Sequence, residues 1–302
     1  MKPEDIILKY YARKKDISKG RTEARFNETV SPMMMPHGLG DSIILTDIWA
    51  ASRGRIQPWS QSRHFKPVMS RVPGWNDEGH APVLVDVPSA YHRWNLGAGH
   101  LLQRVRRMYD IRVDSVPRGG VRSSKAMVPG RVVVHCEAGA HATWQRSNLH
   151  PKARRIYPKT MDAICRFAAS RKELEWTTIG ISEMADSWAN VVETADAAEL
   201  IDHIATCEWF VGIISGPMHI ATALGLKCIV IVNMPDPGEI VLPTLKVLGT
   251  VEEEWFYPQN VHLHQDGAGP LVPKFSIRSL AKAFDGEVYP FWKTDWCKLL
   301  ES

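Results

Sequence analysis

The apolar residues of the C-terminal half recur with two spacings, one typical of amphipathic helices and one typical of buried strands. The helical spacing i, i+3, i+4, i+7 occurs twice, at Met161, Ile164, Cys165 and Ala168 and again at Ala197, Leu200, Ile201 and Ile204. Both segments are therefore predicted to be amphipathic helices. Asp196 is a candidate N-cap of the second helix, and Glu199 follows it in a capping-box arrangement.

Short apolar runs beside these helices predict strands. The runs are "RVVVHCEAG" from residue 131, "EWFVGII" from 208 and "CIVIV" from 228. Strands that alternate with helices favour a parallel sheet. The segment "SIRSLAKAF" from 276 predicts a further helix, and the spacing of His262 and His264 would place both on one face of a strand. No second pair of metal ligands accompanies these histidines, so a metal site there is disfavoured.

The N-terminal half has the same alternation. "TVSPMMM" (29–35) predicts a strand, "HGLGD" a turn, and "SIILTDIWAAS" (42–52) a helix, with further strands at "RIQPW" (55–59) and "APVLVDV" (81–87). Residues 1–28 are polar and lack this alternation, so we expect an appended segment. The Pro/Gly-rich stretch 116–130 precedes the restart of the pattern and is a candidate domain boundary.

The stretch "SGPMHIATALGLKCIVIV" (215–232) follows the strand predicted from 208, and it predicts a tight turn, a helix that begins at the turn, and then the strand "CIVIV". Ser215 can cap the helix, Gly216 allows a close backbone approach, Pro217 suits the first helical turn, and Gly225 ends the helix. Free N–H groups at such a helix start favour a phosphate site, and His219 could add a donor. The alternative is a turn that serves packing alone.

The composition is that of a globular protein. The chain has 302 residues, of which 44% are hydrophobic, enough for two α/β domains. It shows no apolar run long enough to span a membrane and no signal-peptide core, so we expect a cytoplasmic protein. The five cysteines are far apart without a C-x-x-C pair, which favours reduced, structural thiols.

Charge is uneven although the net charge is only +4. Residues 93–131 carry nine basic side chains and two acids, an excess that favours an anionic partner on that side of the molecule. Arg104, Arg106 and Arg107 lie within about one helical turn and are the candidate contacts to an anionic acceptor. The alternative is a solvated basic face without a ligand.

Three segments together resemble glycosyltransferase family 9, the ADP-heptose:lipopolysaccharide heptosyltransferases. "HGLGDSIILT" is similar to the family's N-terminal G-D-x-[IV]-x-x-[TS] motif. "AAELIDHIATCEWFVGIISGPMHIATALGLKCIVIV" (197–232) is similar to the signature of its second domain. "VVVHCEAG" followed by "ARRIYP" resembles the strand that opens that domain and the element after it.

The resemblance implies an α/β protein of GT-B architecture, with two Rossmann-like domains whose parallel sheets face a central cleft. On that basis we expect an appended segment at 1–28, an acceptor domain at 29–128, a nucleotide-sugar domain at 129–272, and C-terminal helices at 273–302 that pack back on the first domain. Two Rossmann-like domains would also fit a sugar-nucleotide epimerase, which needs no acceptor.

The resemblance also implies roles for individual residues. Asp41 matches the family's catalytic base, on a loop with His37, Gly38 and Gly40. Donor-binding positions are Arg154, Arg155, Glu183, Ser215, Gly216, Pro217, Met218 and His219. Arg155 replaces the family's phosphate-binding lysine, and Glu183 matches its ribose-binding acid. Ile214 stands where the family has an aspartate, which is a departure from the pattern.

The residues themselves support metal-independent transfer without a cofactor. The chain has no D-x-D sequence to hold a metal, so helix N-termini and the basic residues of 146–159 must bear the charge of a leaving diphosphate. A carboxylate at position 41 can accept the acceptor's proton, unless it only caps the helix predicted to start at Ser42.

The expected function is therefore inverting transfer of a sugar from a nucleoside-diphosphate sugar to an anionic acceptor. A lipopolysaccharide-type glycan is favoured, and modified bases of viral DNA are the alternative acceptor. A non-catalytic nucleotide-sugar-binding protein on the same scaffold is the alternative from another class. A peripheral membrane contact stays open.

Overall fold

The structure is a computed structural model of the whole chain. It describes residues 38–54, 56, 58, 60, 62–76, 102, 106, 111, 118–136, 156–180, 188–232, 257, 259–265 and 273–288. The strands expected at 29–35 and 81–87 lie outside the described residues, as do most of the strand expected at 55–59 and the tail beyond 288.

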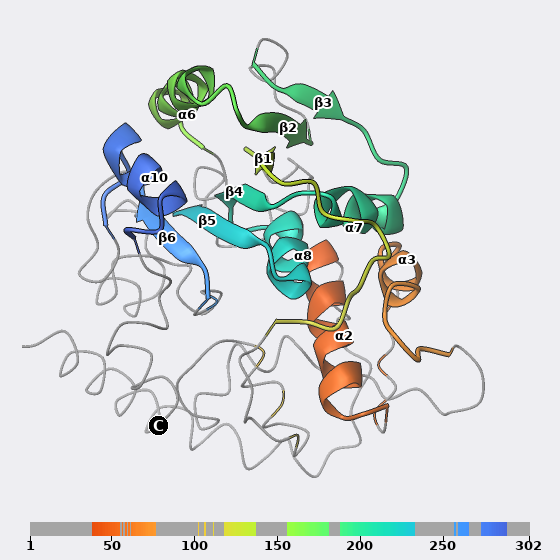
Figure 1. Cartoon of the computed structure of the whole chain (residues 1–302). Helices are drawn as coiled ribbons and strands as arrows, with labels where there is room; N and C mark the ends of the chain where they lie inside the picture. Colours follow the sequence, from red (N-terminus) through yellow and green to blue (C-terminus); the bar gives the residue numbers. More distant parts are fainter. Residues whose placement is uncertain are drawn as a thin grey trace, which may run out of the picture.

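A six-stranded parallel sheet forms the centre of the described fold, in the order β3-β2-β1-β4-β5-β6 (Figure 1). The strands are β1 (Arg131–His135), β2 (Glu175–Ile179), β3 (Asn190–Val192), β4 (Trp209–Ile213), β5 (Lys227–Val232) and β6 (Val261–His264). This is the doubly wound order, in which the direction of chain progress reverses between β1 and β4. The predicted α/β class and parallel sheet are confirmed.

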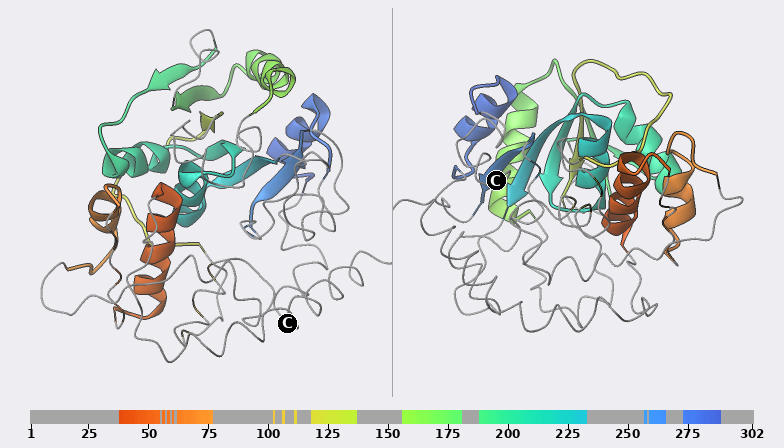
Figure 2. Two further views of the ribbon diagram at one scale, coloured as in Figure 1. Left: turned by 180° about the vertical axis from the view of Figure 1, so that it is seen from behind. Right: turned by 90° about the horizontal axis from the view of Figure 1, so that it is seen from below.

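Helices cover both faces of the sheet (Figure 2). Helices α6 (Pro158–Ser170) and α10 (Ile277–Phe284) pack on one face, through a core that includes Phe167, Trp176 and Phe284. On the other face lie α7 (Ala197–Ala205) and α8 (Gly216–Leu224). Helices α2 (Leu39–Ala51) and α3 (Phe65–Met69) pack in turn on α8 and α7. The sheet therefore has an apolar core on each face, and each core joins residues that are far apart in the sequence.

Local signals at the helix ends act mostly as predicted. The Asp196 carboxylate caps α7 by accepting from the N–H groups of Ala198 (2.7 Å) and Glu199 (3.0 Å). The Glu199 carboxylate accepts from Ala195 N–H, one residue before the N-cap (2.8 Å). Gly225 ends α8 with φ of 85°, a left-handed conformation that favours glycine.

One predicted helix boundary was wrong. Helix α2 begins at Leu39, with Gly38 in the N-cap position, and not at Ser42. The Ser42 hydroxyl donates to the Gly38 carbonyl (3.2 Å), so it acts inside the first turn instead of before it. Helix α10 packs against α6 on the described sheet, and the expected return of the C-terminal segment 273–302 to the first domain stays a prediction.

The structure also bears on the predicted state of the cysteines and on the presence of membrane-spanning helices. Cys136, Cys165, Cys207 and Cys228 are free thiols, and three of them are buried. Cys297 lies outside the described residues. No helix in the described ranges combines the length and the apolar character that a bilayer span requires.

A steric test of the sheet is available at Gly212, which pairs with His135 across β4 and β1. A Cβ atom there would lie 2.5 Å from the His135 carbonyl oxygen, a backbone atom that no rotamer change can move. We expect Gly212→Ala to lower the free energy of unfolding by roughly 2–3 kcal/mol. Urea denaturation measures it.

Gly225→Ala is the matched control for that variant. Nothing lies within 4 Å of a Cβ at Gly225, so only its positive φ is strained. That strain costs about 1–2 kcal/mol. A Gly212→Ala variant more stable than Gly225→Ala would contradict the packing of β4 against β1.

Candidate functional site

The carboxyl ends of β1 and β4 meet at the point where the strand order reverses. In open α/β sheets ligands bind in the crevice outside the carboxyl ends of the strands at such a point. Here His135 is the last residue of β1, and Ser215 lies two residues beyond the end of β4. The Ser215 hydroxyl lies 2.9 Å from His135 Nδ1. Both side chains are buried. A hydrogen bond thus joins the two strand ends at the point where the strand order reverses.

The N-terminus of α8 opens at the same place. Ser215 is the N-cap residue, but its hydroxyl donates to the Ile213 carbonyl (3.2 Å) and makes no cap hydrogen bond to the helix. His219 N–H donates to the Ser215 carbonyl (3.2 Å). Among the described residues, the N–H groups of Gly216 and Met218 have no hydrogen-bond acceptor. Unbonded donors at a positive helix end suit an anion.

Helix α2 brings its own N-terminus to this turn, and the two helices lie side by side in Figures 1 and 2. A Cβ on Gly40 would lie 2.9 Å from His219 Cδ2 and 3.9 Å from Gly216 Cα. A Cβ on Gly216 would lie 2.7 Å from Leu39 Cγ. The two glycines therefore allow two helix starts to touch, and their macrodipoles add at one point.

Asp41 is the third residue of α2, one position after this contact. Its Oδ2 accepts from the Gly38 N–H (3.1 Å), which ties the carboxylate to the start of the helix. The side chain is half-buried. The structure thus brings the Asp41 turn beside the 215–219 turn, although 174 residues separate Asp41 from Ser215 along the chain.

A layer of buried polar side chains lies behind the 215–219 turn. His219 Nδ1 is 2.7 Å from the Tyr257 hydroxyl, and Asn260 Nδ2 donates to Thr222 Oγ1 (2.9 Å). Sequence reasoning missed His135, Tyr257 and Asn260 as site residues. For His135 a signal existed, because a polar residue at the carboxyl end of a buried strand in a doubly wound sheet points to the crevice.

Burial keeps several of these imidazoles neutral. It lowers the pKa of His135 to about 4, that of His262 to about 3 and that of His264 to about 4. His262 and His264 share one face of β6, as their spacing predicted, since they pair with Val230 and Val232. Within the described residues no three metal-ligating side chains gather.

The basic residues expected at the site are described in part. Arg154, Arg155, Glu183, His37, Arg104 and Arg107 lie outside the described residues. Arg106 is buried and forms a two-bond ion pair with the buried Asp47 of α2, at 2.7 and 2.6 Å. For Arg106 the solvated basic face is wrong, since the observed partner of its guanidinium is Asp47. The acceptor contact expected of Arg104, Arg106 and Arg107 stays a prediction, and for Arg106 it would compete with the ion pair to Asp47.

Comparison with solved structures identifies the fold. The glycosyl transferase family 9 structure from Veillonella parvula aligns over 86% of this chain and 96% of its own, with a TM-score of 0.54 and 10% identity. The chain shares the family 9 fold. No protein-family model matches the sequence, and no curated protein matches it significantly.

Two Escherichia coli structures align less well. ADP-heptose lipopolysaccharide heptosyltransferase II has a TM-score of 0.47, and heptosyltransferase WaaC with ADP-2-deoxy-2-fluoro heptose has 0.46. Each is 12% identical and aligns over 83% of this chain and 96% of its own. In the family 9 fold observed here, the described sheet is one Rossmann-like unit of the expected pair. The domain limits of 29–128 and 129–272 stay a prediction.

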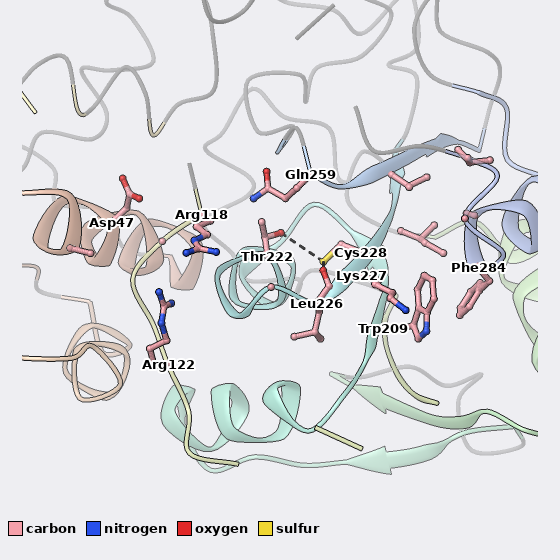
Figure 3. A pocket seen from close by; sticks show the side chains of 18 of the residues that line it. Asp47, Arg118, Arg122, Trp209, Thr222, Leu226, Lys227, Cys228, Gln259 and Phe284 are labelled. Atoms are coloured by element: carbon pink, nitrogen blue, oxygen red, sulfur yellow. Dashed lines mark hydrogen bonds between the residues drawn. The ribbon is translucent and has the colours of Figure 1, made fainter. Parts of the chain in front are cut away.

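A separate cavity of about 1040 Å3 lies at the opposite, amino edge of the sheet (Figure 3). The carboxyl ends of α2, α8 and α10 line it, at Ala50, Gly225 and Asp285, so the negative ends of three helices meet there. Two of its cations already form ion pairs, Lys227 with Glu208 (2.6 Å) and Arg106 with Asp47 (2.6 Å). This cavity is therefore less suited to a diphosphate than the junction of α2 and α8.

Proposed function

We propose that this protein is a glycosyltransferase that moves a sugar from a nucleoside-diphosphate sugar to an anionic acceptor, with inversion and without a metal ion. The observation that carries the proposal is the meeting of two helix N-termini and the Asp41 turn beside the carboxyl ends of β1 and β4. The family 9 fold supports it.

The geometry suits both halves of such a reaction. Departure of the diphosphate needs stabilisation of negative charge, and the N–H groups of Gly216 and Met218 together with two macrodipoles supply it. Attack by the acceptor hydroxyl needs a proton acceptor, and the Asp41 carboxylate lies at the edge of the same junction. Inversion is part of the proposal because a base that activates the acceptor hydroxyl leads to one direct displacement of the diphosphate, and a single displacement inverts the anomeric centre.

The acceptor and the cellular location belong to the same proposal. The local excess of basic residues in 93–131 favours a phosphorylated, lipopolysaccharide-type glycan handled in the cytoplasm. Retention on DNA at moderate salt would instead favour modified bases of viral DNA as the acceptor.

A non-catalytic nucleotide-sugar-binding protein is the second candidate, and Ile214 favours it. This residue occupies the position of the family's aspartate and is buried in the apolar core, so it offers the donor no polar contact. Transfer or donor hydrolysis in the presence of glycan acceptors separates the two candidates.

Nucleotide binding is the first test. We expect one of ADP, UDP, GDP and CMP to raise the thermal stability clearly, because ligand at about 100 times its Kd adds roughly 2.7 kcal/mol. The shift should persist in EDTA. It should be small in Gly40→Ala, whose new Cβ displaces His219, and normal in the cavity variant Arg118→Ala. The donor site is wrong if no nucleotide stabilises the protein, or if binding requires a divalent metal.

A further inference from the structure

Tyr257 is fully buried beside α8, and its hydroxyl lies 2.7 Å from His219 Nδ1. The two rings pack edge to face, with centroids 5.4 Å apart and planes at 74°. Burial, and then the nearby Asp47 carboxylate, raise the pKa of Tyr257 well above its usual value. The phenol therefore keeps its proton near neutral pH and can donate a hydrogen bond to the imidazole.

The turn that carries Tyr257 is docked along α8 by a second contact one helical turn away. Asn260 N–H donates to the Tyr257 carbonyl (3.0 Å), and Asn260 Nδ2 donates to Thr222 Oγ1 (2.9 Å). Thr222 in turn donates to the Met218 carbonyl (3.0 Å). Tyr257 and Asn260 thus contact positions 219 and 222, which are i, i+3 neighbours on one face of the helix.

On its other side the imidazole lies against α2. A Cβ on Gly40 would be 3.3 Å from His219 Nε2, so the Nε2 edge of the ring faces the start of α2. His219 is therefore held between Tyr257 and Gly40, with Nδ1 toward the phenol and Nε2 toward the junction of the two helix N-termini.

We propose that Tyr257 is a positioning residue which donates to His219 Nδ1, so that the neutral ring carries its proton on Nε2 and presents that N–H to the diphosphate of the donor. A neutral imidazole has one donor nitrogen and one acceptor nitrogen, and a phenol that donates to Nδ1 leaves the proton on Nε2. This inference rests on the proposed function, because the diphosphate is its ligand.

The deciding variant is Tyr257→Phe, which keeps the ring and removes the hydroxyl. Nitrogen-15 spectra of the free wild-type protein should show the His219 proton on Nε2, with the resonances assigned by their loss in His219→Gln. In Tyr257→Phe the Nδ1 resonance should move, and the Kd for the stabilising nucleoside diphosphate should rise roughly 10-fold. The Kd for the corresponding nucleoside, which lacks phosphate, should stay within about twofold.

Thr222→Val is the matched control for loosened packing. It removes the Asn260 bond and leaves the Tyr257 hydroxyl in place, so the His219 tautomer and the diphosphate Kd should not change. A proton found on Nδ1 in the wild type overturns the inference. Unchanged diphosphate affinity in Tyr257→Phe also overturns the inference. An equal loss of diphosphate affinity in Tyr257→Phe and Thr222→Val overturns it as well.

The same measurements distinguish a wrong donor site from a wrong role for Tyr257. If the wild type binds none of ADP, UDP, GDP and CMP, the donor site is wrong and the ligand named here falls with it. If the wild type binds one of them and Tyr257→Phe binds it equally well, the donor site stands and only the role of Tyr257 is overturned.

Discussion

Asp41→Asn should lose roughly 10²–10⁴ in kcat while donor affinity stays the same. An asparagine oxygen can still accept from the Gly38 N–H, so the start of α2 keeps its hydrogen bond. The amide cannot accept a proton in the transition state, whereas the proposed diphosphate site is at the N-terminus of α8. Because only the macrodipole contribution of the charge is lost, stability should fall by no more than about 1 kcal/mol. Steady-state transfer and nucleotide titration measure the two quantities.

Two further variants distinguish the two possible roles of Asp41, as a general base and as a hydrogen-bond acceptor at the start of α2. Asp41→Ala should lose the Gly38 hydrogen bond and about 1 kcal/mol of stability, with little further loss of rate. Asp196→Asn makes the same chemical change at the N-cap of α7, away from the crevice, and should keep both stability and transfer. Near-normal transfer by Asp41→Asn would remove Asp41 from the mechanism and leave His37 as the next candidate base.

The helices around the sheet could be predicted because their signals are local. Apolar periodicity located α6 and α7, the cap at Asp196 and the stop at Gly225 marked ends, and Pro217 marked the first turn of α8. In each case the contacts that form the end of the helix lie within one turn of it. A single sequence carries such information without any knowledge of the fold.

Strand β2 was missed because its buried positions are partly polar. Thr177 and Thr178 are buried, and their hydroxyls donate to the carbonyls of Val132 (3.0 Å) and Val134 (3.4 Å) on β1. A hydroxyl satisfied by the neighbouring strand can enter a core, but in the sequence it breaks the apolar run that indicates a strand. Strand β3 is short and mostly exposed, so it has no apolar run at all.

The sequence predicted that the two motifs of the site lie close together, but it did not predict which distant side chains form pairs. The resemblance brought Asp41 and the 215–219 turn to one cleft, and the structure places them together. The Arg106–Asp47 pair joins residues 59 apart, and the His219–Tyr257 pair joins residues 38 apart. Nothing in the spacing of either pair reveals it, because tertiary packing alone selects the partner.

The buried histidines should make stability fall steeply between pH 6.5 and 4. The folded-state pKa values of His135 and His264 are about 4 and that of His262 is about 3, whereas an unfolded histidine titrates near 6.5. As pH falls through this window the unfolded chain binds protons that the folded chain excludes, so the free energy of unfolding decreases. The full contribution is present above pH 6.5 and is lost as the folded pKa values are reached.

Each histidine contributes roughly 3–5 kcal/mol to this loss once the folded-state pKa is reached, since one pKa unit corresponds to about 1.4 kcal/mol. The three contributions together are comparable with the 5–15 kcal/mol that typically stabilises a whole domain. We therefore expect acid unfolding to begin above pH 5, before ordinary carboxylates are extensively protonated. Urea denaturation midpoints from pH 7.5 to 5 measure the slope, and a flat profile over that range would contradict the neutral, buried state of these rings.

His264→Leu isolates one of the three. Within the described part of the chain, neither ring nitrogen of His264 has a hydrogen-bond partner, and the side chain is fully buried on the β6 face beside Val232. Leucine fills similar space and removes both the orphaned nitrogens and the titration. The variant should be more stable than the wild type by about 2 kcal/mol at pH 5, with a smaller gain at pH 7.5. An equal gain at both pH values would mean that His264 packs poorly but does not titrate, and the acid sensitivity would then belong to His135 and His262.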